Sequence, residues 1–204
     1  MGILFRVREW FRHALGFRGA GVAGSDWFES RLFCCLPREF EIQVGSLIKE
    51  VRGIDMDRDR YFSVPYARVL AIEQGEVIGV VELFRRQIVF DGESLSMGGV
   101  GGVVTAEKRR RRGVATALLR MGMEDFRAQS IDVAFLCADV NNPVMVKLYG
   151  RVGFVPLGKP YVYRGESGAE YVEHNGMIAP VNSNDKFRHI LRGKGILDIG
   201  VGAW

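Results

Sequence analysis

The stretch that most constrains the fold covers residues 103–119, with the sequence VVTAEKRRRRGVATALL. It begins with β-branched residues typical of a strand end, continues through a short basic turn, and enters an amphipathic pattern after Gly113. The apolar residues that recur at helical spacing, and that suit packing against a sheet, are Val114, Leu118, Met121 and Phe126. The stretch therefore predicts a strand–turn–helix unit.

The turn of this unit is suited to hold a phosphate. The N–H groups of a helix's first turn have no intrahelical partner and carry partial positive charge. Gly113 and Ala115 leave no large side chain to keep a pyrophosphate from those amides. The spacing Arg110-x-x-Gly113-x-Ala115 is neither a Walker loop nor a GxGxxG dinucleotide turn. A nucleic-acid or localisation patch is the alternative, and the position between strand and helix favours the phosphate site.

Positive charge is concentrated at this turn. The formal net charge is +4, and residues 107–112 alone carry +4, so the remainder of the chain is balanced. A basic footprint spread over the whole surface, as in many nucleic-acid-binding proteins, is not present. The distribution indicates an anionic ligand at one place. A length of 204 residues, 48% of them hydrophobic, is typical of one globular domain or one domain with a tail.

The three cysteines form neither a CxxC motif nor a zinc-binding spacing, and their odd count favours a reducing, cytoplasmic location. The charged segment 53–60 lacks the glycine and glutamate of an EF-hand, so it predicts a solvated loop and no metal site. No apolar run approaches the roughly 20 residues that span a bilayer.

The N-terminal residues differ from the rest. Residues 1–18 predict a basic amphipathic helix, with Leu4, Val7, Phe11 and Leu15 at helical spacing. Docking on its own domain or on a dimer mate is favoured over a membrane-surface or partner-binding role. Residues 16–24 are glycine-rich and predict a linker. The expected organisation is an N-terminal helix and linker over 1–28 and a domain over 29–204.

Alternating and helical patterns place the remaining elements. Strands are expected at 31–36, 67–73, 77–85, 87–90, 95–105, 133–138, 154–163 and 171–181, and helices at 39–51, 113–129, 143–151 and 187–191, before a short extended piece at 198–204. Gln74-Gly75 predicts a β-hairpin. Four glycines between 98 and 102 indicate a bulge or the close approach of a ligand. The order predicts an α/β protein with a mixed sheet.

Two motifs in this order resemble those of the GNAT superfamily of N-acetyltransferases. The pattern Arg110-x-x-Gly113-x-Ala115 resembles its acyl-CoA pyrophosphate loop. The segment 142–154, NPVMVKLYGRVGF, resembles its second motif, in which an Asn opens a helix that carries Leu-Tyr and ends in Gly-Phe. The resemblance covers roughly residues 30–181. It implies an α/β GNAT fold, with a mixed, mostly antiparallel splayed sheet flanked by helices, and acetyl-CoA as cosubstrate.

Within the superfamily, the chain looks most like aminoglycoside 2′-N-acetyltransferases, with nodulation N-acyltransferases as more distant relatives. The shared features are the run at 84–88, the glycine-rich strand, and the final segment 198–204. The first 28 residues lie outside this weaker resemblance.

The resemblance implies a cofactor site built mainly from backbone. The strand end would align the pantetheine, and amides from Arg111 to Thr116 would hold the pyrophosphate with help from the arginines. The residues expected to bind the cofactor are Val103, Val104, Thr105, Arg110, Arg111, Arg112, Gly113, Val114, Ala115, Thr116 and Asn142. A role as helix N-cap would by itself explain Asn142.

Tyr149 is the residue expected to act as general acid, because a phenol has a higher pKa than the departing thiol. Packing of its ring in the core is the alternative. The general base is open, since Gly101 stands where the aminoglycoside enzymes carry a carboxylate. Candidates are Glu82, Asp139 and the α-carboxylate of Trp204, and an amine of modest pKa needs no strong base.

The resemblance implies that the last segment lies in the acceptor site, where the Trp204 indole would bind a cationic substrate; a loose terminus is the alternative. The expected activity is acetyl-CoA-dependent N-acetylation of a small polar amine, with aminoglycosides as candidates. Other candidates are a protein amine, an amino-sugar oligosaccharide with a longer acyl donor accommodated by the glycines, and a non-catalytic acyl-CoA-binding module. A homodimer that covers strand edges is also a candidate.

Overall fold

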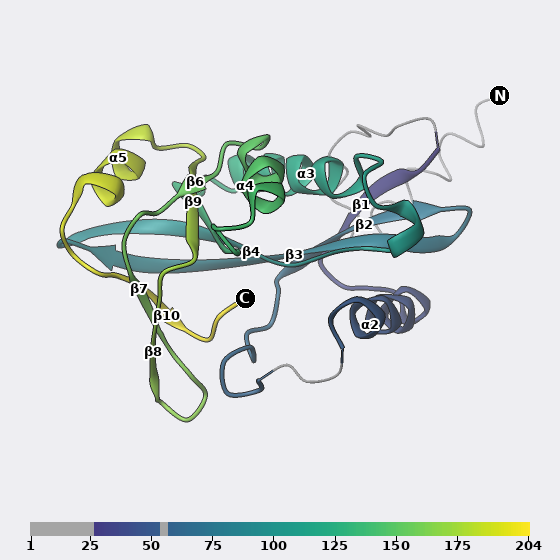
Figure 1. The fold of residues 1–204 in the computed structure, drawn as a ribbon, viewed down its shortest axis with the longest axis horizontal. Helices are drawn as coiled ribbons and strands as arrows, with labels where there is room; N and C mark the ends of the chain where they lie inside the picture. The colour runs from purple at the N-terminus through teal and green to yellow at the C-terminus, as the bar shows by residue number, and fades with distance from the viewer. Residues whose placement is uncertain (1–26, 54–56) are drawn as a thin grey trace.

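Two β-sheets and four α-helices make up the computed structural model, which describes residues 27–53 and 57–204 (Figure 1). The larger sheet has seven strands in the order β1-β2-β3-β4-β5-β9-β6, and the smaller has the order β10-β7-β8. The predicted helix over 1–18 and the glycine-rich linker lie outside the described residues.

The element bounds follow the chain. They are β1 Glu29–Phe33, α2 Arg38–Arg52, β2 Ala67–Glu73, β3 Glu76–Phe90, β4 Glu93–Thr105, a 3₁₀ turn Glu107–Arg109, α3 Val114–Ala128, β5 Val133–Cys137, α4 Pro143–Gly150, β6 Val155–Pro156, β7 Tyr161–Arg164, β8 Glu170–Glu173, β9 Gly176–Pro180, α5 Asn184–Arg192 and β10 Leu197–Val201. The helices expected at 39–51, 113–129, 143–151 and 187–191 are confirmed, with small shifts of their ends.

Strands β2, β3 and β4 form an antiparallel meander joined by two tight turns. Both central residues of each turn have positive φ, at Gln74-Gly75 and at Asp91-Gly92. Such turns match the right-handed twist of the flanking strands. The separate strands expected at 77–85 and 87–90 are wrong, because β3 is continuous over both. The C-terminal part of β3 extends beyond β2, because the pairing between the two strands ends at Ala67↔Leu83.

Side chains of the meander alternate between two covered faces. Val81 and Leu83 point to the face covered by α3 and α4, whereas Val80 and Phe84 point to the opposite face. Figure 1 shows α3 and α4 on one side of the large sheet, with α2 and the small sheet on the other. We call these the α3 face and the α2 face.

The two long strands expected at 154–163 and 171–181 are wrong. Each is divided into short strands that join different sheets: β6 pairs with β9 in the large sheet, and β7 pairs with β8 in the small one. The division follows the sequence, because Gly158 has a φ of +73° and Pro160 has no N–H to donate. The last segment forms β10, which runs parallel to β7. The predicted mixed sheet is therefore accompanied by a second sheet of three strands.

Strands β4 and β5 separate partway along their length. They pair from Met97↔Val133 to Val100↔Leu136, while β4 continues to Thr105. In the described part of the chain, residues 101–105 of β4 have no partner strand on this side. We call this stretch the open edge. Its first residues carry a bulge against β3, where Gly102 has a φ of +55°.

Candidate functional site

The open edge leads directly into the predicted phosphate-binding turn. Gly113 is the N-cap of α3, with a φ of +87°, and the first backbone bond of the helix runs from the Ala117 N–H to the Gly113 carbonyl. The N–H groups of residues 114–116 precede that bond and have no intrahelical acceptor. No atom lies within 4 Å of the position of a Cβ on Gly113. The turn thus presents open amides that fit a pyrophosphate.

The arginines of the turn have distinct positions. Arg109 forms an ion pair with Glu73 at the end of β2, which ties the turn to the sheet. The Nε of Arg110 donates to the Thr105 carbonyl at 3.3 Å, and the Arg112 guanidinium lies 3.8 Å from the ring centroid of Trp27. Arg111 is exposed, with a φ of +62°. Arg110 to Arg112 thus surround the turn with exposed positive charge, although two of them also contact the protein.

Tyr149 is on α4 and is buried on the α3 face of the large sheet. The Asn142 side chain caps its helix by accepting from the Val144 N–H at 3.0 Å, as the N-cap prediction requires. Tyr149 is buried in the same core cluster as Val100 and Leu136, the pair at which β4 and β5 last meet. The helix therefore places the tyrosine side chain in the core on the α3 face of the large sheet.

The glycines of β4 give space to side chains of this protein. A Cβ on Gly98 would lie 2.8 Å from the Phe126 ring, and one on Gly99 would lie 2.5 Å from the Trp204 indole. Gly101 faces the Trp204 carbonyl carbon, and Gly102 faces the Glu82 side chain. The expected close approach is therefore made by the protein itself. The space at the glycine Cβ positions is thus filled by these side chains, and a longer acyl donor stays a prediction.

Trp204 is anchored in the α2 face, so the alternative of a loose terminus is wrong. Its side chain is buried, stacks on Phe84 with ring centroids 5.9 Å apart, and meets Phe135 edge-on. The Arg86 guanidinium lies 4.2 Å from the indole ring centroid. Among the described residues, the buried indole Nε1 has no hydrogen-bond partner.

Arg86 fixes the last segment in place. It donates to the carbonyls of Ile199 and Gly202, the latter at 2.6 Å, and to the Ser63 hydroxyl at 2.7 Å. Burial lowers the pKa of Arg86 to about 10, so the group is still a cation at neutral pH. Before the fold was known, Arg86 stood out only as part of the run at 84–88, although a charge at an inward position of an alternating strand was a signal for this role.

The three base candidates have different surroundings. Glu82 is on the α2 face, paired with Arg68 at 2.8 Å and packed over Gly102 beside the open edge. Asp139 is exposed, and its Oδ1 accepts from the Asn141 N–H at 3.0 Å, as in a turn. The structure thus brings Glu82 and Trp204 together near Gly101 and uses Asp139 to form the turn before α4.

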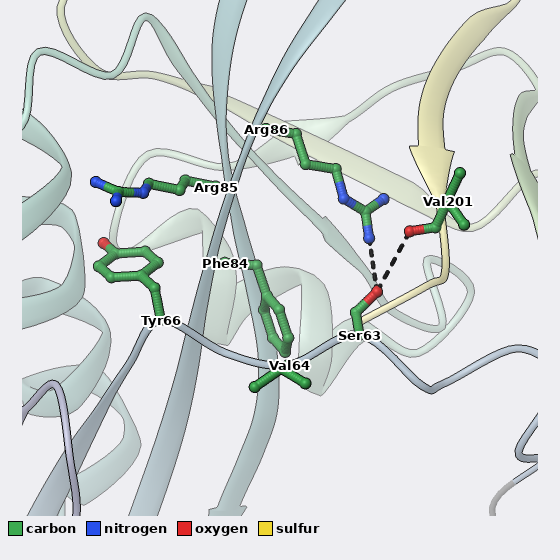
Figure 2. Close-up of a pocket in the computed structure, with 7 residues that line it drawn as sticks. All are labelled: Ser63, Val64, Tyr66, Phe84, Arg85, Arg86 and Val201. Carbon is green, nitrogen blue, oxygen red and sulfur yellow. Dashed lines mark hydrogen bonds between the residues drawn. The ribbon is translucent and has the colours of Figure 1, made fainter. Parts of the chain in front are cut away.

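A pocket of about 330 Å³ lies where β3 extends past β2. It is lined by Ser63, Val64, Tyr66, Phe84, Arg85, Arg86 and Val201, and we call it the β3-edge pocket. Figure 2 shows Arg85 and Tyr66 on one side of the strand and Arg86 and Ser63 on the other. Sequence reasoning missed this pocket, because its lining comes from three separate segments.

The segment before the pocket is structural, and the prediction of a solvated loop is wrong at its end. Asp59 accepts from the Tyr171 hydroxyl at 2.6 Å and the Ser167 N–H at 2.7 Å. These two hydrogen bonds lower the pKa of Asp59, and the bond from Tyr171 has the larger effect. The Arg60 guanidinium lies over the Tyr171 ring. The backbone carbonyl of Arg60 accepts a hydrogen bond from the Ala203 N–H. The loop therefore connects the small sheet to the last segment.

Residues 27–53 and 57–204 contain no cluster of three or more His, Cys, Asp or Glu side chains that could hold a metal ion. The three cysteines are free in this part of the chain. Within the same ranges, no helix is both long and apolar enough to cross a membrane.

The model of the GNAT acetyltransferase domain matches residues 49–157, which is more than half of the chain and includes the open edge, the turn and α4. The chain belongs to the GNAT acetyltransferase family. GNAT acetyltransferases use acetyl-CoA, and the open edge and the amides at Gly113 fit that molecule.

Solved GNAT structures share the fold. YhbS, a GNAT family N-acetyltransferase from Escherichia coli in complex with CoA, is 16% identical, with a TM-score of 0.56 over 89% of this chain and 93% of that one. The ribosomal-protein-S18-alanine N-acetyltransferase from Escherichia coli is 13% identical, with a TM-score of 0.50 over 74% and 94%.

A GCN5-related N-acetyltransferase from Kribbella flavida is 20% identical, with a TM-score of 0.52 over 69% of this chain and 36% of that one. This GNAT chain thus spans about a third of the Kribbella protein. At these identities the three structures show the fold alone. No curated protein matches the sequence.

Proposed function

We propose that this GNAT protein transfers the acetyl group of acetyl-CoA to an amine of a small polar molecule. The observation that carries the proposal is the continuous main-chain surface that runs from the open edge at 101–105 to the amides of residues 114–116. Unpaired strand groups can align an extended chain, and a helix N-terminus favours a pyrophosphate. Such positioning of the donor lowers the entropic cost of the reaction.

Tyr149 is the proposed general acid. Its burial in the core cluster that also contains Val100 and Leu136, the last pair between β4 and β5, supports this role. Acetyl transfer breaks the bond between the carbonyl carbon and the thiol sulfur, and the thiolate that leaves takes up one proton. A phenol can supply that proton and be reprotonated, because its ordinary pKa is higher than that of a thiol.

Glu82 is the proposed group that receives a proton from the amine. Its partly buried carboxylate lies beside Gly102 and is held by Arg68. The exposure of Asp139 and its bond within a turn make it the weaker candidate. An acceptor amine of modest pKa reacts from its neutral fraction, in which case Glu82 contributes little beyond orientation.

The acceptor is proposed to bind on the α2 face, beside Trp204 and the β3-edge pocket. Trp204 lies over Gly101, which begins the open edge, and stacks on Phe84, which lines the pocket. Aminoglycosides are one class of acceptor suggested by the sequence resemblance, but the two arginines that line the pocket disfavour a polycation. Contact of residues 1–18 with a membrane or partner, and a homodimer, stay predictions.

Thiol release from acetyl-CoA tests the proposal, with aminoglycosides, polyamines, amino sugars and peptide N-termini as acceptors. We expect release with one class, and a loss of about 100-fold in kcat for Tyr149→Phe, within the usual range for a general acid. Tyr61→Phe is a control, because that exposed tyrosine lies outside the pocket lining.

Each negative result has its own meaning. Tight acetyl-CoA binding without release from any amine would favour the non-catalytic acyl-CoA-binding module. Absence of acetyl-CoA binding would refute the donor site. An unchanged kcat in Tyr149→Phe, with transfer intact, would assign the tyrosine to the core and leave the activity in place.

A further inference from the structure

We infer that the acceptor carries an anionic group, a carboxylate or a phosphate, which binds in the β3-edge pocket, where Arg86 and Arg85 line the edge of β3 from its two sides. The inference deepens the proposed function, on which it rests for the amine end of the same molecule. It follows from the charge of the pocket, the fixed position of one arginine, and the residues that lie between the pocket and the open edge.

The lining of the β3-edge pocket is cationic. Two arginines and the hydroxyls of Ser63 and Tyr66 provide its polar groups, and Val64, Phe84 and Val201 provide apolar surface. No carboxylate is among the lining residues. The Ser63 hydroxyl donates to the Val201 carbonyl and the Tyr66 hydroxyl to Asp125. The two guanidinium groups are therefore the donors that would select for an anion.

Arg86 is a fixed cation without a carboxylate counter-ion. Its guanidinium donates to two carbonyls and one hydroxyl, and within the described ranges it forms no ion pair. Asp198 attracts it at longer range, but that carboxylate is paired with Arg164 at 2.9 Å. Removing a cation from water is costly unless an opposite charge is brought to it. An anion in the pocket would supply that charge.

Arg85 flanks the pocket from the other side of the strand (Figure 2). Its guanidinium lies 5.2 Å from the Tyr66 ring centroid and donates to the Gln129 side chain at 2.9 Å. Nearby Asp125 accepts instead from the Tyr66 hydroxyl at 2.6 Å and from Gln129. In the described residues Arg85 also has no ion pair, so its exposed charge remains available to a ligand.

The buried side chains of Phe84 and Trp204 lie between the β3-edge pocket and the start of the open edge. Phe84 lines the pocket and pairs with Gly99 on β4, and Trp204 joins Phe84 to Gly101. Neighbouring strands are about 5 Å apart. An acceptor whose amine and anion are several bonds apart, such as an amino acid or an amino-sugar phosphate, fits this span. A polycationic aminoglycoside would place like charges against two arginines.

Matched pairs of amines test the inference. Glucosamine 6-phosphate is compared with glucosamine, and lysine with lysinamide, while tobramycin represents the polycations. We expect kcat/KM to be at least about tenfold higher for the anionic member of one pair, because a charge-assisted hydrogen bond contributes roughly that factor. The pair that shows the difference identifies phosphate or carboxylate as the ligand group.

Variants locate the preference in the pocket. Arg85→Gln should raise the KM of the anionic acceptor about tenfold, with little change for its neutral partner or for acetyl-CoA. Arg86→Gln should raise the KM of the anionic acceptor at least as much. Because Arg86 also holds the last segment beside Trp204, we expect the KM of the neutral acceptor to rise as well, and folding of this variant is checked by thermal unfolding. Arg188→Gln, an exposed arginine on α5, is the matched control.

Equal kcat/KM within both pairs, or a preference for tobramycin, would overturn the inference and leave acetyl transfer established. If no amine is acetylated, calorimetric binding of glucosamine 6-phosphate and of lysine decides the matter. Binding of either probe that Arg85→Gln abolishes would support the anion site and reject the proposed function, whereas absence of binding of both would reject the anion site as well.

Discussion

The two sides of β4 are built in different ways. Toward β5 and α3, the open edge and the turn at Gly113 form one contiguous stretch whose backbone is the binding surface. Toward β3, the surface is made of side chains from the segments 59–66, 82–86 and 199–204. The backbone surface toward β5 and α3 keeps its shape with many different side chains. The surface toward β3 changes whenever one of its side chains changes. The backbone surface suits an acetyl donor that a whole family shares, and the side-chain surface suits an acceptor amine that differs from one protein to another.

The largest expected effect comes from filling the acceptor side. In Gly101→Val, the new Cβ would lie 2.6 Å from the Trp204 backbone, which cannot yield as a flexible side chain does. We expect a loss of about 3 kcal/mol in the free energy of unfolding, measured by urea denaturation, and a raised KM for the acceptor.

Gly45→Ala is the matched control for that substitution. Gly45 lies in α2 with nothing within 4 Å of the Cβ position, so alanine should stabilise the protein by about 0.5–1 kcal/mol. A Gly101→Val protein as stable as the parent would mean that the last segment does not depend on the glycine strand.

Filling the donor side should have the opposite kinetic signature. Gly113→Val places a branched side chain at a φ of +87° and over the amides of the turn, although the Cβ itself meets no atom. We expect about a tenfold increase in the KM of acetyl-CoA and an unchanged acceptor KM. Backbone strain should also lower the free energy of unfolding by about 1–2 kcal/mol. If both glycine variants change the same KM, the division between the two sides is wrong.

The smallest effect concerns Cys137, which ends β5 and packs against the core cluster of Trp204, so it tests how dry that cluster is. Burial raises the pKa of this thiol to about 11. The hydrogen bond that its sulfur accepts from the Tyr161 hydroxyl acts in the opposite direction and lowers the pKa by less. The folded pKa is above the ordinary 9.0, so the thiol's contribution to stability is present below pH 9 and is lost as the pH rises toward 11. At pH 8, iodoacetamide should label the exposed Cys34 and Cys35 rapidly and Cys137 slowly. Equal labelling of all three would indicate an open interior.

The same division explains how far the sequence could be interpreted. The strand–turn–helix unit and the Asn142 cap depend on neighbours within a few residues, and their local patterns predicted them correctly. The β3-edge pocket depends on Arg86 meeting Gly202, 116 positions away, and no local pattern indicates such a contact. The glycines of β4 were recognised as sites of close approach, but the partner, Trp204, was identified in the folded chain.

The bonds from Arg86 to the last segment also have a consequence for the order of folding. Contacts between residues far apart in the chain require the closure of large loops, whereas hairpins and single helices form from near neighbours. We expect the meander and α3 to gain protection from hydrogen exchange early during refolding, and the segment from β10 to Trp204 to gain it last. An intermediate would then have its donor side formed while its acceptor side was still incomplete.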